Sequence, residues 1–540
     1  MKLTIRHACA GWLLLAWPVC AGATGAAANQ PAPPPAHVLA LSRQWRVDLL
    51  WDAAGAGATY EVQRAPQPGG PFTPLPARLP GVNAYSDFIG RAGGDYFYRV
   101  RAIRPGGTNG AAAASAWSEI RSGSPKPLDP EGLLDEVQEA GFRYFFDFAH
   151  PVSGLARVGT SKDGDVCSIG GTGWGLYNLV VGVQRGFVSR EEGAKRTLQI
   201  LRFLSNKADR FHGAFPHWIN GATGKVVPFK PLDDGADLVE TGFLTEGLLL
   251  VREYFSGQDQ PEVEIRKLAD GLWRSVEWDW FAQEKNGHPC LFWHWSPQFG
   301  WQKNHAISGF NECQIIYVLA LASPTHPIPP RYYWQGWEST YYGTEHTEFG
   351  VRLTLGRELG PPLFWTHYSY LGLDPRQISY GGKSYFQHFQ DFCHVQILYA
   401  DSRRAEFKGY GPLWGLTASH GPNGYKAFAP GRRDNGTISP TAALSSMPYV
   451  PEQSRAFLLN LYEQYGARLW GPFGFYDAFN LTRDWISVDY LGNDVGPICP
   501  MIENYRSGLC WNTFMKAPEI HSVIKVLANP PQPGVLARRE

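Results

Sequence analysis

Three carboxylates in one short segment are the first candidates for chemistry. Asp233, Asp237 and Glu240 are separated by four and then three residues, a spacing that places side chains on one face of a helix. For Asp233 a structural interpretation competes, because carboxylates at a helix start cap its amides and stabilise its dipole. Glu240 lies about two turns further along, which is too deep for that role. We therefore expect the acidic stripe to face a polar cavity, where a carboxylate can activate water.

Glu312 is an isolated carboxylate in an uncharged, aromatic-rich segment. The apolar spacing over His305–Leu321 predicts a buried helix with Glu312 inside it. Burial without a basic neighbour raises the pKa of a carboxyl group, as a general acid requires. The alternative is a core glutamate that is satisfied by an arginine from another helix. Because burying an unpaired carboxylate is costly, we favour the catalytic interpretation.

A third candidate is Asp494, in the segment Gly492–Pro497. It could be a second catalytic carboxylate, or it could only cap the helix that follows, with Pro497 in the first turn. Glu503 and Arg506 could contact a ligand or form a local ion pair. The other residues predicted to bind a ligand carry rings or histidine nitrogens, and they are Trp174, His217, His305, Trp337, His367 and Trp414.

Several other chemistries lack their motifs. The sequence has no G-x-S-x-G elbow, no phosphate-binding P-loop and no H-E-x-x-H helix, which argues against serine hydrolases, nucleotide hydrolases and zinc proteases. It has no Cys-x-x-Cys pair or histidine-rich spacing, so we predict neither a metal nor another cofactor. Six cysteines follow the first 23 residues, and one or two disulfides are compatible with them.

The composition narrows the choice of partner. The 49 Lys and Arg balance the 49 Asp and Glu, so the chain lacks the basic excess that nucleic-acid binding needs. Aromatic residues make up 14% of the chain and charged residues only 18%. Flat apolar faces with polar rims suit amphipathic ligands such as sugar rings.

The first residues have the pattern of an export signal. Lys2 and Arg6 precede an apolar stretch, and Ala21-Gly22-Ala23 offers a cleavage site, which predicts a signal peptide over residues 1–23. No later apolar run reaches the roughly 20 residues of a membrane span. We therefore expect a periplasmic or secreted protein with no membrane contact after cleavage. Residues 24–36, rich in Ala, Gly and Pro, are predicted to be a linker.

Two domains with different sequence patterns, one typical of strands and one typical of helices, are expected to position these residues. Alternating short runs over 37–122 predict a small β-sandwich that serves for spacing or packing. Over 130–528, polar-faced and buried helices alternate, as is typical of an α/α toroid. Ser189 and Glu192 form a capping box, and the glycines of 170–175 indicate close helix packing. The predicted helices include Leu133–Phe146, Ala236–Phe255, Glu262–Trp280, His305–Leu321, Tyr385–Tyr399, Glu452–Tyr465 and Pro497–Trp511.

Two long connections, 323–365 and 400–440, are predicted to form the walls of a cleft, because loops between packed helices are usually shorter. The aromatic residues expected to line those walls are Tyr332, Tyr333, Trp334, Trp337, Trp365, Trp414 and Tyr425.

Taken together, the motifs of 130–528 resemble the glucoamylase-like proteins of glycoside hydrolase family 144. The segments that carry the resemblance are 233–241, 310–312, 322–327, 366–376, 414–419, 434–443 and 501–506. The resemblance implies an (α/α)6 toroid that hydrolyses β-1,2-glucans with inversion. It also implies that Glu312 is the general acid and that Asp233, Asp237 and Glu240 form an acidic site cluster. Asp494 matches an expected Asp-Gln-Gly-Pro motif in which Val495 replaces Gln. The 37–122 region resembles a fibronectin type III module.

We therefore expect an exported glycoside hydrolase that acts on β-1,2-glucan. An open, aromatic cleft favours internal cutting, whereas loops folded over one end would favour release of sophorose from a chain end. A non-catalytic glucan-binding protein is a further alternative. A polysaccharide lyase would need a basic patch for uronates, and the neutral charge balance gives no sign of one.

Overall fold

The computed structural model describes residues 33–528, except 56, 105–111, 304 and 340–341. The predicted signal peptide over 1–23 lies outside the described residues, as does most of the predicted linker, of which 33–36 are irregular. None of the helices within the described ranges is long and apolar enough to cross a bilayer.

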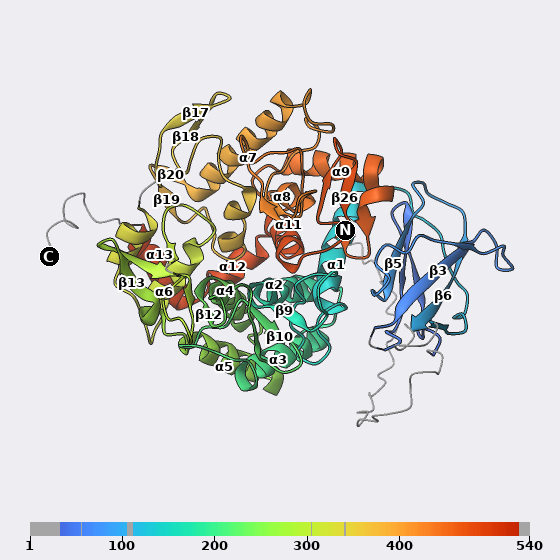
Figure 1. Cartoon of the computed structure of the whole chain (residues 1–540), viewed down its shortest axis with the longest axis horizontal. Coiled ribbons are helices and arrows are strands. Elements are labelled where there is room, and N and C mark those ends of the chain that lie inside the picture. The colour runs from blue at the N-terminus through green and yellow to red at the C-terminus, as the bar shows by residue number, and fades with distance from the viewer. Residues whose placement is uncertain (1–32, 56, 105–111, 304, 340–341, 529–540) are drawn as a thin grey trace, which may run out of the picture.

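The N-terminal part is a sandwich of two antiparallel sheets. One sheet has the order β1 (Leu39–Arg43), β2 (Arg46–Leu50), β5 (Ala84–Phe88); the other has the order β4 (Thr73–Pro74), β3 (Thr59–Ala65), β6 (Tyr96–Arg104), β7 (Ala113–Ala114), with β8 (Arg121–Gly123) on β6. Alternate residues of each strand point inward, so that Val47, Leu49 and Val100 are fully buried. The sandwich lies beside the helical part, next to α1 and α9 (Figure 1).

The remainder of the described chain is mainly helical. Its helices are α1 (Pro130–Phe146), α2 (Ile169–Arg185), α3 (Arg190–Asn206), α4 (Leu238–Tyr254), α5 (Gln260–Arg274), α6 (Gln314–Ala322), α7 (Tyr385–Ser402), α8 (Pro440–Leu444), α9 (Pro451–Leu469), α10 (Gly492–Val495), α11 (Ile498–Arg506), α12 (Leu509–Phe514) and α13 (Pro518–Leu527). The capping box is confirmed: Ser189 Oγ accepts a hydrogen bond from Glu192 N, and the Glu192 carboxylate accepts one from Ser189 N. The six described cysteines are buried and unpaired.

Short strands and turns connect these helices. The small sheets pair β9 (Val166–Ser168) and β11 (Val226–Val227) with β10 (Trp218–Asn220), β12 (Ala236–Asp237) with β15 (His294–Trp295), β14 (His288–Phe292) with β13 (Ala282–Lys285) and β16 (Ala306–Ile307), β17 (His346–Glu348) with β18 (Val351–Leu353), β19 (Ser379–Tyr380) with β20 (Lys383–Ser384), β21 (Ala418–Ser419) with β22 (Lys426–Ala427), β23 (Trp470–Gly471) with β24 (Gly474–Phe475), and β25 (Ala478–Asn480) with β26 (Trp485–Ser487). The single-turn helices are η1 (Trp278–Phe281), η2 (Tyr332–Trp337), η3 (Leu363–Thr366) and η4 (Tyr368–Tyr370).

Three of the predicted helices are interrupted. The prediction over His305–Leu321 is wrong in its first half: the helix begins at Gln314, because Gly309 has a left-handed φ of 75° and Asn311 Oδ1 accepts from Cys313 N in a turn. The prediction over Pro497–Trp511 divides into α11 and α12 at Gly508, where φ is 69°. The helix predicted over Glu262–Trp280 ends at Arg274. In each case apolar spacing continues through a backbone break.

Helices α2 and α4 lie side by side near the middle of the helical part (Figure 1). A Cβ on Gly173 would lie 2.2 Å from the carbonyl oxygen of Phe243, and one on Gly247 would lie 2.4 Å from the carbonyl oxygen of Gly173. The predicted close packing at 170–175 is therefore confirmed. It brings the N-terminal ends of both helices together.

We expect Gly173→Ala to lower the free energy of unfolding by about 3 kcal/mol, because backbone atoms of α4 must move to admit the methyl group. Gly271→Ala on α5 is the matched control, since nothing lies within 4 Å of its Cβ position. That change should raise the free energy of unfolding by about 0.5–1 kcal/mol, because alanine is the better helix former. Urea unfolding of both variants measures the difference, and equal effects would contradict the packing argument.

Candidate functional site

The acidic cluster surrounds the start of α4 and does not form a stripe along it. Asp237 is the N-cap, where its Oδ1 accepts hydrogen bonds from Val239 N and Glu240 N, both at 3.0 Å. Asp233 lies in the preceding turn. The expected single helix face is therefore wrong, because the helix begins only at Leu238. The capping interpretation, which competed with the catalytic one for Asp233, holds for Asp237.

Glu240 faces the start of α2. Its carboxylate accepts a 2.8 Å hydrogen bond from Gly170 N and a 3.3 Å hydrogen bond from Ser168 Oγ. A Cβ on residue 170 would lie 2.7 Å from Glu240 Oε2, so glycine is required for this approach. Burial, together with the charge of Asp237, raises the pKa of Glu240.

Three basic side chains balance this cluster. His217 Nδ1 lies 2.8 Å from Asp237 Oδ2, and His217 Nε2 lies 4.0 Å from Glu240 Oε1. Burial opposes protonation of the imidazole, but Glu240 and Asp237 outweigh it and raise the pKa of His217 to about 9. Burial would likewise raise the pKa of Asp237, but the imidazoles of His294 and His217 hold it below its usual value. Lys303 Nζ lies 2.9 Å from Asp233 Oδ2.

His217, Asp233 and Asp237 lie close enough together to hold a metal ion. Their own surroundings already supply positive charge, through the Lys303 ammonium and a His217 imidazolium that is protonated at neutral pH. A protonated imidazole has no lone pair to give a metal. The donor set therefore fits an internal ion network better than a metal centre.

Glu312 lies in the turn just before α6. Burial raises its pKa to about 7, and no neighbouring charge contributes to that shift. An arginine partner, the alternative for this residue, would have lowered the pKa. Part of the residue's surface remains accessible. A carboxyl group in this state is protonated near neutral pH and can still reach a ligand.

Asp494 lies in α10 and caps no helix, since Pro497 occupies the N-cap of α11 and no side chain caps that helix. Neither carboxyl oxygen of Asp494 makes a well-formed hydrogen bond with a described residue, and the nearest polar groups are the Asp477 carboxyl and the Tyr368 hydroxyl. Burial, followed by the neighbouring carboxyl of Asp477, raises the pKa of Asp494 well above its usual value. Asp477 itself accepts from His420 N at 2.8 Å and faces His420 Nδ1 at 2.9 Å. The two aspartates thus form a buried carboxyl pair.

Two tyrosines connect these groups into one site. Burial and the charges of Asp494, Glu312 and Glu240 raise the pKa of the Tyr368 hydroxyl, so all three carboxyls lie within electrostatic range of it. The same three carboxyls and Asp477 act on Tyr425. Tyr425 leaves 52% of its surface exposed, although the acids are within electrostatic range of its hydroxyl. The structure therefore brings together the three separate acidic motifs of the sequence.

The predicted ligand-binding residues divide into three groups. His217 lies in the cluster, and His305 is exposed and stacks on Trp293 with 4.8 Å between ring centroids. Trp174, Trp337, His367 and Trp414 are at most 2% exposed, so for these four the expected contact with a ligand is corrected. Glu503 pairs with Arg185 at 2.6 Å and Arg506 donates to Gln138 Oε1 at 2.9 Å, and their contact with a ligand stays a prediction. Fully covered rings pack the core and offer no face to a ligand.

Sequence reasoning missed Asp477, His420, His294 and Asp489. Asp477 stands alone among aromatic residues in a stretch that resembles the surroundings of Glu312, and that signal could have found it. Asp489 Oδ1 accepts from Thr160 N at 3.1 Å and Ser161 N at 3.0 Å, partners that no local pattern indicates. Chemically, the site offers one protonated acid and a second, buried carboxyl pair, which suffices for acid and base catalysis of a hydrolysis.

Comparison with known proteins gives matches along most of the chain. The model of a family described as "Putative glucoamylase" matches residues 304–518. An exo β-1,2-glucooligosaccharide sophorohydrolase of Parabacteroides distasonis is 42% identical over 475 residues, covering 84% of this chain and 65% of that protein. The chain thus spans less than two thirds of that relative's length.

Solved structures of β-1,2-glucanases also match the chain. A β-1,2-glucanase from Parabacteroides distasonis matches with a TM-score of 0.86 and 40% identity, covering 92% of this chain and 73% of that one. An endo-β-1,2-glucanase from Chitinophaga pinensis matches with a TM-score of 0.71 and 45% identity, covering 74% of this chain and 98% of that one. With 40–45% identity and a shared structure over these lengths, the chain belongs to the glucoamylase-like proteins of glycoside hydrolase family 144.

Proposed function

We propose that the protein hydrolyses β-1,2-glucosidic bonds in β-1,2-glucans, by a single displacement that inverts the anomeric carbon. The observation that carries the proposal is that Glu312, Glu240 and Asp494 are buried carboxyls within electrostatic range of the same two hydroxyls, those of Tyr368 and Tyr425, with the Tyr368 hydroxyl hydrogen-bonded to the carbonyl oxygen of Asn493 next to Asp494. Relatives that share most of the chain are a β-1,2-glucanase and a sophorohydrolase.

In this mechanism Glu312 is the general acid. With a pKa of about 7, about half of the Glu312 carboxyls carry a proton in neutral solution and more do at lower pH, and the protonated form can give its proton to the glycosidic oxygen as the C1–O bond breaks. A water molecule attacks C1 from the opposite face of the ring, and a second carboxylate takes one of its protons. Inversion requires roughly 6.5–9.5 Å between the two carboxyls to leave room for that water.

We assign the base to the Asp494–Asp477 pair. Both oxygens of Asp237 are occupied by backbone amides and histidines, and Asp233 is held by Lys303. Neither carboxyl oxygen of Asp494 is held by a backbone amide, a histidine or a lysine among the described residues, and its neighbours are the Asp477 carboxyl and the Tyr368 hydroxyl. Two neighbouring buried carboxyls resist being ionised together, so one keeps its proton and the other is left as the carboxylate that accepts a proton from the water. Asp233, Asp237 and Glu240 would then hold the site's charge and contact sugar hydroxyls.

Two modes of cutting are candidates. The long loops led us to expect internal cutting, but Tyr332, Tyr333, Trp337 and Trp414 of the predicted walls are buried. The rings expected to line an open cleft are therefore fewer than the sequence indicated. Release of sophorose from a chain end is the second candidate, favoured by this burial and by the 84% of the chain that the sophorohydrolase matches.

Three further proposals accompany the activity. We infer from residues 1–23 that the protein is exported to the periplasm or beyond. We also infer that the helices form an (α/α)6 toroid, as in the family. The substrate is neutral, so the site needs no basic patch and no cofactor. A glucan-binding protein without turnover would retain β-1,2-glucan and release no new reducing ends.

Glu312→Gln should lower kcat by about 10²–10⁴-fold, the usual contribution of a general acid. The matched control is Glu338→Gln, because burial also raises the pKa of Glu338, to about 8, while none of the site tyrosines senses its charge. The control should keep kcat within a few-fold of the parent. Release of reducing ends from linear β-1,2-glucan measures both, and ordinary turnover by Glu312→Gln would refute the assignment.

The pH profile should follow the acid form of Glu312. Because its raised pKa of about 7 keeps the proton on below that pH, kcat/KM should fall about tenfold for each pH unit above it. The His217 imidazolium persists to about pH 9, so its loss should appear as a second, later decline. A rate that stays constant from pH 6 to 9 would contradict this order of titrations.

Early products from β-1,2-glucans of several lengths should separate the two modes. Internal cutting gives a ladder of mixed oligosaccharides, whereas cutting from an end gives sophorose alone. Proton NMR of the first product tests inversion at the same time, since the newly formed reducing end must be the α-anomer. A β-anomer as first product would exclude the single displacement.

A further inference from the structure

We propose that the β-sandwich is a positioning part of the active site, which holds residues 470–495 so that Asp477, Asp489 and Asp494 keep their places. The inference rests on the proposed function, because it treats these acids as part of the reaction. It goes beyond that function in assigning a catalytic contribution to a domain that the sequence presents as a spacer.

A buried ion pair first fixes the sandwich to the helical part. Arg46 on β2 is only 1% exposed, and its guanidinium lies 2.7 Å from Glu136 on α1. The same group donates to the Tyr462 hydroxyl on α9 at 2.8 Å and lies 4.2 Å from the centre of the Trp470 ring. Removing one partner of such a pair leaves a buried charge uncompensated. The ion pair therefore fixes the position of the sandwich relative to α1 and α9. Through the Arg46–Trp470 contact it also reaches the first residue of β23.

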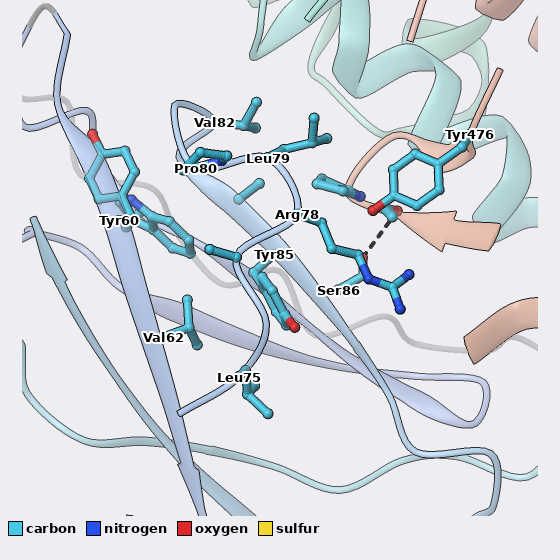
Figure 2. Close-up of a pocket in the computed structure, with 15 residues that line it drawn as sticks. Tyr60, Val62, Leu75, Arg78, Leu79, Pro80, Val82, Tyr85, Ser86 and Tyr476 are labelled. Atoms are coloured by element: carbon cyan, nitrogen blue, oxygen red, sulfur yellow. Dashed lines mark hydrogen bonds between the residues drawn. The ribbon is translucent and has the colours of Figure 1, made fainter. Parts of the chain in front are cut away.

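Backbone contacts continue along the same segment. Arg78 donates to the carbonyl oxygens of Arg468 at 2.8 Å and Ala467 at 2.9 Å, and Ser86 Oγ donates to the carbonyl oxygen of Gly471 at 3.2 Å. Figure 2 shows this junction, with Arg78 and Ser86 of the sandwich facing Tyr476 of the helical part. The sandwich thus holds the chain immediately before Tyr476 and Asp477.

One apolar cluster then spans both domains. Val82 and Ala84 of the sandwich pack in it together with Phe473, Tyr476, Tyr490 and Val495 of the helical part. Tyr476 precedes Asp477, Tyr490 follows Asp489, and Val495 follows Asp494. Each of the three acids is therefore next in sequence to a member of the cluster to which the sandwich contributes Val82 and Ala84, and Tyr476 lines a pocket together with those two residues.

The acids themselves are held from the other side by the helical part. His420 binds Asp477, while Thr160 and Ser161 bind Asp489. Because the neighbours of the acids belong to the shared cluster and close-packed interiors transmit strain, we expect a shift in the cluster to move the carboxyls. A misplacement of about 1 Å near reacting groups can lower a rate about 10²-fold.

Two full-length variants test the inference against a matched control. Val82→Ala opens a gap in the shared cluster, and Ala84→Leu overfills it. Val100→Ala makes the same valine deletion in the sandwich's own core, away from the helical part. We expect Ala84→Leu to lower kcat at least tenfold and Val82→Ala about threefold, with KM within twofold of the parent. Val100→Ala should leave kcat within twofold, even at an equal loss of thermal stability.

The pKa of His420 can be measured without substrate, so it tests the positioning role of the sandwich separately from the proposed hydrolysis. Hydrogen bonding to Asp477 raises the pKa of His420, which also faces Asp489 and Lys162. NMR titration of histidine-labelled protein should show the His420 pKa falling toward its ordinary value in Val82→Ala and Ala84→Leu, and staying in place in Val100→Ala. If the parent hydrolyses no β-1,2-glucan, the proposed function fails while this titration still tests positioning.

Equal titration of His420 in all three variants, or loss of kcat only in proportion to loss of folded protein, would overturn the inference. If Ala84→Leu does not fold, Val82→Ala and Val100→Ala carry the comparison alone, since they delete the same two methyl groups from two different cores.

Discussion

Burial of carboxyl groups is the constraint on which the rest of the site depends. Taking a carboxylate out of water costs several kcal/mol unless the protein supplies charge or hydrogen bonds. The protein meets this cost in opposite ways within one site. Asp237 has amides and two histidines and stays ionised, whereas Glu312 has no partner charge and keeps its proton near neutral pH. Burial of carboxyl groups thus produces both a proton donor, Glu312, and a permanently ionised group, Asp237.

The sequence identified carboxyl groups without a charged neighbour more readily than it identified which residues pair with one another. Glu312 could be recognised because a lone carboxylate among aromatic residues must be buried without help, and its raised pKa follows from that alone. The partners of Asp237 come from His217 and His294, far apart in the chain, and no local spacing connects them. The pairing of Asp494 with Asp477 was missed for the same reason. Residue types predicted the chemistry, and only the fold could supply the pairs.

Periodicity predicted most helices, including α1, α4, α7 and α9, because their apolar positions reflect real burial. It failed where the backbone breaks under an apolar pattern, as it does at Gly309, which releases Glu312 from the helix into a turn. Aromatic residues misled in a related way. A tryptophan suits a core as well as a sugar, so Trp337 and Trp414 were assigned to the cleft although both are buried.

Although the chain divides into two domains, the positions of the acids in the helical part depend on packing against the sandwich. The helical part holds Asp477 and Asp489 through His420 and Thr160, yet the residues next to these acids pack in a cluster that the sandwich completes. A pair of neighbouring buried carboxyls is sensitive to small changes in separation, because the repulsion between like charges rises steeply in a medium of low dielectric constant. Contacts on both sides of residues 470–495 therefore help to keep the separation of the pair constant. The helical part supplies the contacts on one side, and the sandwich supplies those on the other.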